Sequence, residues 1–256
     1  MGKLVFAGAI SHAPGATGWP EKADPQMKDN FYRAAAQLGQ MIRDAKPDVI
    51  IGVANDHVSN FHVDNFPTFA VGLASEHVGP GDWFEPWLKV PKYRVKGHPE
   101  FAGLLYNGLT KQGVVTAIHR DNFVFDDNYS VPLTLAGLTT AGIPLVPVMM
   151  NCTVPPVMSS QEAYATGKKF AKVFAEQFPD DVRIAFLATG GMSHEPGGHK
   201  YFHIDEKFDR WVMDLLARFD HKTIIEEVTY EKMEEAGSGG TSELLAWFIV
   251  MAAAGE

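Results

Sequence analysis

Short, continuous apolar runs alternate with longer amphipathic segments, and this alternation constrains the fold more than any other feature of the sequence. Leu4–Ile10, Val49–Ala54 and Leu145–Met150 have the length and unbroken apolar character of strands buried on both faces. Between them, segments such as Met27–Lys46 repeat apolar residues three and four positions apart, which predicts helices. We therefore expect an α/β fold, a layered sandwich with a central, largely buried sheet flanked by helices.

The rest of the chain continues the pattern without an internal repeat or an evident interdomain linker, so we expect a single catalytic domain over residues 1–256. The segment Gly81–Lys92, with its tryptophans and prolines, is predicted to be a long loop. Further strands are predicted at Thr68–Leu73, Val114–Ala117 and Arg183–Ala188, and further helices at Glu100–Gln112, Gln161–Phe178, Lys207–Phe219 and Ser242–Ala253.

Charge and cysteine content exclude several classes of protein. The chain has 22 Lys and Arg against 31 Asp and Glu, and its net charge of −9 disfavours binding to nucleic acid or to an anionic membrane. A single cysteine, Cys152, can form neither an internal disulfide nor a Cys-rich zinc or iron–sulfur site. The apolar run Leu4–Ile10 is too short for a membrane span and lacks the shape of a signal peptide, so a cytoplasmic location is expected.

Three predicted strands are each followed closely by a histidine. His12 follows the first strand, His57 follows Val49–Ala54, and His194 follows Arg183–Ala188. A lone histidine after a strand is more often a loop residue than a ligand. However, the carboxyl ends of parallel strands meet at one edge of a sheet, where α/β proteins bind ligands. Three such histidines therefore point to a shared site at this edge.

A glycine-rich segment near the end of the chain supplies a carboxylate. Glu243 follows Gly237-Ser-Gly-Gly and starts the apolar segment Leu244–Phe248. We expect Thr241 or Ser242 to cap this helix, with Glu243 in its first turn. Taken alone, the arrangement is typical of a helix cap, and the glycine spacing is a weak phosphate-binding signal.

Two histidines and one carboxylate are the donors of the facial-triad ferrous site, which leaves the opposite face of the metal open. Zinc accepts the same donors in hydrolases. A third histidine that is not a ligand could act as a base, because its pKa lies near working pH.

Several motifs then sharpen this interpretation. They are Ser11-His12-Ala13-Pro14, Asn55-Asp56-His57, Pro67–Gly72, Val95–Pro99, Val131-Pro132-Leu133, Thr189–His194, and the segment from Gly237 to Phe248. In these motifs and their order, the chain resembles the class III extradiol ring-cleavage dioxygenases, in the group of the catalytic subunit of protocatechuate 4,5-dioxygenase.

The resemblance implies a role for each residue of the shared site. His12, His57 and Glu243 would bind Fe(II), and His194 would be the acid/base catalyst beside the substrate. It also implies a homo-oligomer that acts on a small aromatic substrate and O₂. The substrate would be a chelating ring such as a dihydroxylated benzoate, a gallate, an aminophenol or a dihydroxypyridine.

Three further residues are candidates to support a metal ligand or to line the substrate pocket. Asp56 stands beside His57 and could orient it, and Tyr129 could contribute to an aromatic pocket. Asp127 marks a departure, because members of the family that the chain resembles carry a histidine at this place, just before Val131-Pro132-Leu133. Two other functions stay open at this point: a metal-dependent hydrolase on the same scaffold, and a non-catalytic binding relative.

Overall fold

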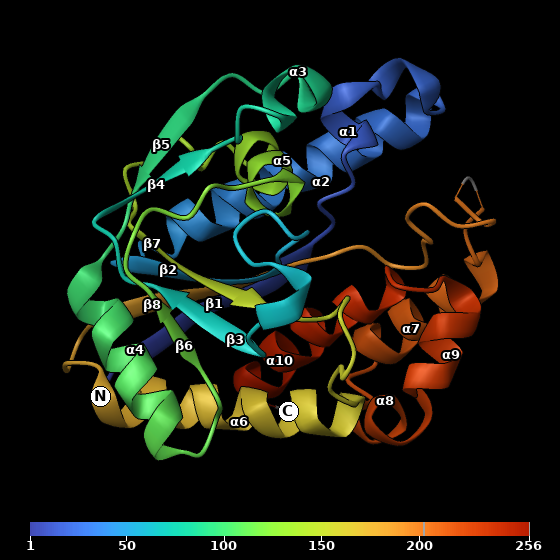
Figure 1. The fold of residues 1–256 in the computed structure, drawn as a ribbon. Coiled ribbons are helices and arrows are strands. Elements are labelled where there is room, and N and C mark those ends of the chain that lie inside the picture. Colours follow the sequence, from blue (N-terminus) through green and yellow to red (C-terminus); the bar gives the residue numbers. More distant parts are fainter. Residues whose placement is uncertain (202, 256) are drawn as a thin grey trace.

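A six-stranded sheet in the order β1-β8-β2-β7-β3-β6 forms the centre of the computed structural model, which describes residues 1–201 and 203–255 (Figure 1). Strands β1, β8, β2 and β7 are parallel, β3 is antiparallel to β7, and β6 is parallel to β3. The bounds are β1 Lys3–Ile10, β2 Val49–Asn55, β3 Phe69–Gly72, β6 Ala117–His119, β7 Leu145–Met150 and β8 Arg183–Thr189.

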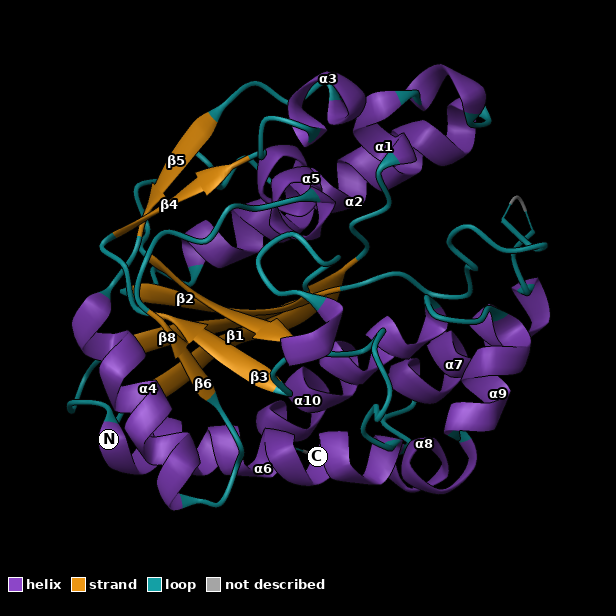
Figure 2. Ribbon diagram, viewed as in Figure 1, coloured by secondary structure: helices purple, strands orange, loops and turns teal. Residues whose placement is uncertain are grey.

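Helices cover both faces of this sheet, which confirms the predicted layered α/β sandwich (Figure 2). On one face lie α4 (Pro99–Lys111), α6 (Ser160–Gln177) and α10 (Leu244–Ala254). On the other lie α2 (Pro25–Asp44) and α5 (Asp127–Leu135).

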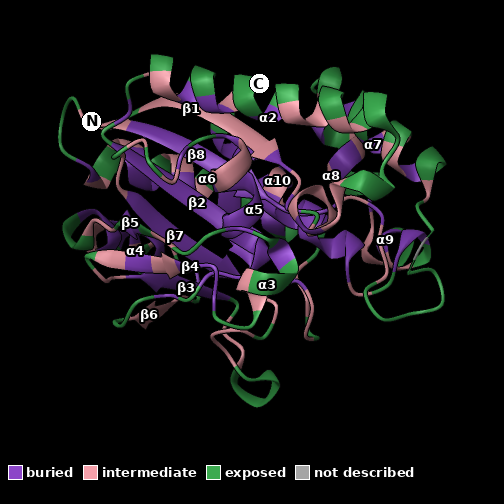
Figure 3. Ribbon diagram, turned by 90° about the horizontal axis from the view of Figure 1, so that it is seen from above, coloured by how far each residue is buried: buried purple, intermediate pink, exposed green. Residues whose placement is uncertain are grey.

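Strand β2 shows why the apolar runs are continuous. Val49, Ile51 and Val53 belong to the core cluster that includes side chains of α6 and α10, whereas Ile50 and Ala54 belong to the cluster that includes α2 and α5. Successive side chains of a strand point to opposite faces, so a strand covered on both sides needs apolar residues at every position. All of β2 is accordingly buried between the helical layers (Figure 3).

Several elements were not predicted, among them a second, small sheet and helices α3 (Phe84–Leu88) and α5. Strands β4 (Glu76–Gly79) and β5 (Tyr93–Lys96) form an antiparallel pair outside the main sheet. The expected loop Gly81–Lys92 contains helix α3, so the loop prediction was wrong there. Leu88 is fully buried against Val90 and Val131, and this contact stabilises the helical turn. In the sequence alone, the prolines of the segment favour a loop.

Short helices complete the structure. They are α1 (Gly15–Gly18), α7 (Glu206–Ala217), α8 (His221–Glu227), α9 (Tyr230–Ala236) and the 3₁₀ turns η1 (Pro20–Lys22), η2 (Val63–Asn65) and η3 (Thr241–Glu243). Within residues 1–201 and 203–255, no helix combines the length and the apolar character that a membrane crossing requires.

Candidate active site

The three histidines that follow predicted strands lie at one edge of the sheet. Strands β1, β8 and β2 are parallel neighbours, so their carboxyl ends meet at this edge. His12 follows β1, His57 follows β2 and His194 follows β8. The parallel arrangement on which the sequence argument depended is therefore present.

Glu243 is the residue on which these histidines converge. His12 Nε2 lies 3.0 Å from Glu243 Oε2, and His57 Nε2 lies 3.0 Å from Oε1. His194 Nε2 lies 3.7 Å from Oε1. The carboxylate is held from the other side by the backbone N–H of Gly191, which donates to Oε2 at 2.5 Å. Glu243 sits at the N-terminus of α10, where the helix dipole favours a negative charge.

His12 is fixed in one tautomer by a chain of hydrogen bonds. The hydroxyl of Thr189 donates its only proton to the carbonyl of Asn128 at 2.7 Å. Toward His12 Nδ1, which is 3.2 Å away, that hydroxyl can therefore only accept. Nδ1 must therefore carry a proton, and Nε2 is the nitrogen that faces the carboxylate of Glu243.

His57 has the same orientation for a different reason. Its Nδ1 lies 3.2 Å from Asp126 Oδ1 and 3.1 Å from Asp127 Oδ1, and carboxylates are acceptors. Although burial opposes the charged imidazole, these two carboxylates outweigh it and raise the pKa of His57 well above its ordinary value. On the other side of the ring, Nε2 forms a hydrogen bond with Glu243 Oε1 at 3.0 Å.

His194 repeats the pattern but is more open to solvent. Its Nδ1 lies 2.8 Å from the carbonyl oxygen of Met192, which can only accept, so Nδ1 carries the proton. The side chain of His194 is 36 % exposed, whereas that of Glu243 is 2 % exposed. Burial acts to lower the pKa of His194, but Glu243 and the Met192 carbonyl raise it overall. The structure thus places an accessible nitrogen base beside a buried carboxylate.

The arrangement of these side chains makes the centre of the site suitable for a cation. The Nε2 atoms of His12 and His57 both face the carboxylate of Glu243 at contact distance. Among the described residues, His12 Nε2 is buried and has no hydrogen-bond partner of good geometry. Burial acts to raise the pKa of Glu243, yet His12 and the other imidazoles hold it well below its usual range. Two imidazole nitrogens and a carboxylate are suitable ligands for a divalent transition metal.

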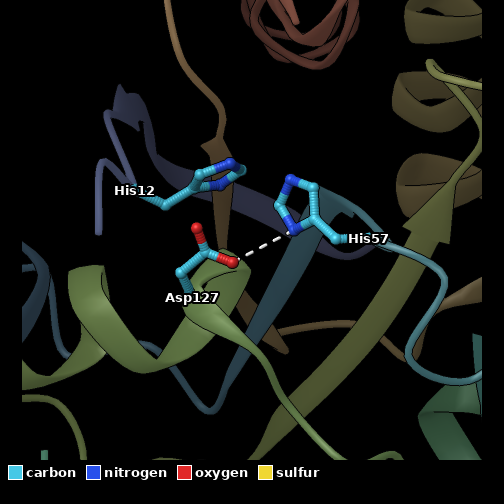
Figure 4. Close-up of side chains that lie close together, drawn as sticks. All are labelled: His12, His57 and Asp127. Carbon is cyan, nitrogen blue, oxygen red and sulfur yellow. Dashed lines mark ion pairs between the residues drawn. The ribbon is translucent and has the colours of Figure 1, made fainter. Parts of the chain in front are cut away.

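A second carboxylate borders the same pair of histidines. His12, His57 and Asp127 each offer one potential ligand atom within 4.8 Å of the others, a grouping that could hold a metal ion. Figure 4 shows the Asp127 carboxylate beside both rings, with one oxygen paired to His57. Since Glu243 lies on the Nε2 side of His57 and Asp127 on its Nδ1 side, the imidazole lies between two carboxylates.

The side chains of the other two predicted site residues, Asp56 and Tyr129, form hydrogen bonds away from the histidines of the site. Asp56 is fully buried and accepts hydrogen bonds from the backbone N–H groups of Asn60 and Phe61, so it shapes the loop after β2. Tyr129 packs against Phe125 in the core, and its hydroxyl donates to the carbonyl of Val148 at 3.4 Å. No ion pair or hydrogen bond recorded within the described residues joins either side chain to His57.

Sequence reasoning missed Asp126, which does contact His57. Asp126 is fully buried and accepts from the His57 backbone at 3.1 Å, from Ser59 Oγ at 2.8 Å and from the Asn128 backbone at 2.8 Å. It caps helix α5 while its carboxylate reaches His57 Nδ1. Aspartate is a preferred helix cap, but this signal could not be used because helix α5 itself was not predicted.

The start of the last helix also differs from expectation. The predicted cap by Thr241 or Ser242 is wrong, because both lie in η3 and α10 begins at Leu244 with Glu243 as its N-cap residue. The Thr241 hydroxyl instead donates to the carbonyl of Gly237 at 2.8 Å. Glu243 is therefore placed by a 3₁₀ turn, and its side chain is free to face the histidines.

Comparison with known proteins gives the site a context. The family described as the catalytic LigB subunit of aromatic ring-opening dioxygenase matches residues 7–256. Among solved structures, protein JW3007 from Escherichia coli K12 is similar, with a TM-score of 0.57 and 19% identity over 87% of this chain and 81% of that one. At this identity the likeness shows the fold.

Curated relatives share part of their sequence with this chain. A protein of Photorhabdus laumondii named 2,3-dihydroxyphenylpropionate/2,3-dihydroxicinnamic acid 1,2-dioxygenase is 29% identical over 188 residues, which is 73% of this chain and 55% of that protein. A protein of the same name from Rhodococcus globerulus is 28% identical over the same shares. The chain thus matches about half the length of these relatives.

Proposed function

This chain belongs to the family of the catalytic LigB subunit of aromatic ring-opening dioxygenases, and from that premise we propose that it is a non-haem Fe(II)-dependent extradiol dioxygenase. It would open a catechol-like aromatic ring with O₂. The observation that carries the proposal is the convergence of the Nε2 atoms of His12 and His57 on the carboxylate of Glu243, with His194 beside them.

His12, His57 and Glu243 would hold the metal. Their donor set, two imidazoles and one carboxylate, is that of the facial triad of ferrous oxygenases. When bound, Fe(II) would offer open positions to the two oxygens of a diol and to O₂ and would favour loss of the diol protons. Because Nδ1 of His12 contacts Thr189 and Nδ1 of His57 lies beside Asp126 and Asp127, both rings present Nε2 to the centre of the site.

His194 would move protons during the reaction. Its Nε2 would accept a hydroxyl proton from the incoming diol and later return a proton to the oxygen of the product. The Nδ1 contact with the Met192 carbonyl fixes the ring so that Nε2 is the reactive nitrogen. Its greater exposure is the property expected of a group that meets substrate rather than a buried ligand.

Asp126 and Asp127 would have separate tasks. Asp126 accepts three hydrogen bonds from its own neighbourhood and would keep His57 in place. Asp127 has one carboxylate oxygen paired with His57 and would use the other to accept a hydrogen bond from substrate. The substrate range we propose includes the dihydroxyphenylpropionate class named for the relatives and other ring chelators such as gallates, aminophenols and dihydroxypyridines.

Oxygen uptake by anaerobically purified protein tests this function. Protein loaded with Fe(II) and a matched sample loaded with Zn(II) would be compared against a panel of dihydroxyphenylpropionate, catechols, gallates, aminophenols and hydroxypyridones. We expect uptake only with iron, together with one equivalent of a ring-opened product. Turnover of the zinc form without oxygen uptake would instead support a hydrolase and overturn the proposal. Stoichiometric iron with no uptake on any member of the panel would also count against it.

A further inference from the structure

Glycines from two separate segments pack against the ring of His194. One is Gly191, in the loop after β8, and the other is Gly240, immediately before η3. A Cβ atom on Gly191 would lie 2.4 Å from His194 Cε1 and 2.6 Å from Nδ1. A Cβ atom on Gly240 would lie 2.6 Å from both Cδ2 and Nε2 of the ring and 2.5 Å from the backbone oxygen of His194. The two glycines therefore border opposite edges of the imidazole.

The reason for glycine at these positions is steric rather than conformational. Gly240 has φ −114° and ψ −44°, a backbone conformation open to any L-residue. Its neighbour Gly239 is the opposite case, because its φ is +75° and nothing lies within 4 Å of a Cβ placed there. Gly239 thus serves the turn, whereas Gly240 leaves room for the His194 ring.

The backbone of His194 is confined as well. A Cβ atom on Gly237 would lie 2.4 Å from the carbonyl oxygen of His194, although its φ of 178° is ordinary extended backbone. The Nδ1 contact with the Met192 carbonyl at 2.8 Å and the close approach of these glycines thus hold both the ring and the backbone of His194. The glycine-rich segment before Glu243 is therefore explained by close approach to a histidine rather than by phosphate binding.

We propose that Gly240 is a positioning residue for His194: by leaving no side chain at the Nε2 edge, it lets the ring lie with Nε2 3.7 Å from Glu243. This inference rests on the proposed function for its effect on turnover, but the position and tautomer of His194 do not depend on it. Gly191 shares the packing role. However, its N–H also holds Glu243, so Gly240 is the better position to test.

The test compares Gly240→Ala, His194→Ala and the double variant in a mutant cycle. We expect Gly240→Ala to lower kcat by about 100-fold, the cost of misplacing a reacting group by about 1 Å, with unchanged iron content. In the His194→Ala background the same change should have a much smaller effect, because the ring contacts are gone and only the contact with the backbone oxygen of residue 194 remains. Ser238→Ala, an exposed change in the same segment, is the matched control. Equal losses in both backgrounds, or a loss of iron, would overturn the proposal.

A second measurement does not use activity. In metal-free wild-type protein labelled with ¹⁵N-histidine, NMR at an alkaline pH at which the ring is neutral should show His194 as a single Nδ1–H tautomer, assigned by its absence from His194→Ala. Gly240→Ala should convert this signal to a tautomer mixture. A mixture already present in the wild type would contradict the proposal even if the variant failed to fold. If His194 is a single tautomer but the iron-loaded protein has no oxygenase activity, the proposed function fails while this inference about Gly240 stands.

Discussion

The molecule places histidines in two contrasting environments. At the carboxyl edge of the sheet, the buried His12 and the half-buried His57 lie among carboxylates. In β4, His77 is fully buried between the rings of Phe123 and Phe125, with centroid distances of 5.8 and 5.7 Å. Its Nδ1 accepts a hydrogen bond from the Phe123 backbone at 3.0 Å.

The contrast teaches that burial alone does not decide what a histidine does. Burial, with a smaller contribution from His119, lowers the pKa of His77 to about 4, so this ring stays neutral and acts as a structural acceptor. At His57 the same burial is outweighed by Asp126 and Asp127, and its pKa rises. A site that stabilises a proton on an imidazole beside carboxylates also suits a metal ion, which takes the place of the proton.

The largest expected effect follows from removing the charge at the centre of the polar environment. Glu243→Gln keeps the shape of the side chain but removes the anion between His12 and His57. We expect metal affinity to fall by more than the roughly 10–100-fold that loss of a supporting partner costs, with turnover lost in parallel. Metal analysis and oxygen uptake would measure both. Glu235→Gln, at an exposed position on the same segment, is the control, and full iron content in Glu243→Gln would refute the ligand assignment.

His194, the most exposed of the three site histidines, should behave differently when it is replaced. His194→Ala is expected to keep its iron, because the proposed ligands are untouched, while turnover falls by about 10²–10⁴-fold, the usual contribution of general acid–base catalysis. Single-turnover oxygen uptake with an iron assay on the same sample would separate the two quantities. Iron lost in proportion to activity would instead make His194 a ligand.

Replacing the two aspartates beside His57 sharpens the comparison further. Asp126→Asn replaces a carboxylate with an amide, so only one side-chain oxygen is left to accept from His57, Ser59 and Asn128. We therefore expect iron affinity to fall by about 10–100-fold. Asp127→Asn should leave affinity closer to wild type and change KM values across the substrate panel. Competition with a chelator measures the first effect and steady-state kinetics the second. The same affinity loss in both variants would remove the proposed division of tasks.

The central sheet and the edge that carries the polar residues could be predicted because both depend on short stretches of sequence. The continuous apolar run Val49–Ala54 indicates a strand buried on two faces, and His57 follows it within three residues. Helix α5 could not be found in this way. Residues Asp127 to Leu133 are all buried and Pro132 lies inside the helix, so no amphipathic period marks it.

Contacts between segments that are distant in the sequence could not be predicted either, because no local pattern indicates them. Asp126 lies far from His57 in the sequence, and Gly240 is adjacent to His194 only because η3 folds against the loop after β8. The sequence does not distinguish a glycine that is needed for close approach from one that is needed for a turn, such as Gly239. Only the position of the neighbouring side chain distinguishes them.

The smallest expected effect tests the apolar environment of His77. Since its folded pKa of about 4 is below the ordinary value of 6.5, the unfolded chain binds the additional proton between these values, and stability falls as pH falls through that window. The wild type should therefore lose about 2 kcal/mol more unfolding free energy between pH 7 and pH 5 than His77→Gln, whose amide can still accept from Phe123 but does not titrate.

Denaturant unfolding at the two pH values would measure this difference, and every other titrating group, including His57 and His194, is common to both proteins. His62→Gln is the matched control, because the His62 side chain is 73 % exposed and pairs only at the surface with Asp64. Parallel pH profiles for wild type and His77→Gln would mean that water or a charge reaches the ring. The contrast between the two histidine environments would then reflect their distance from the carboxylates alone.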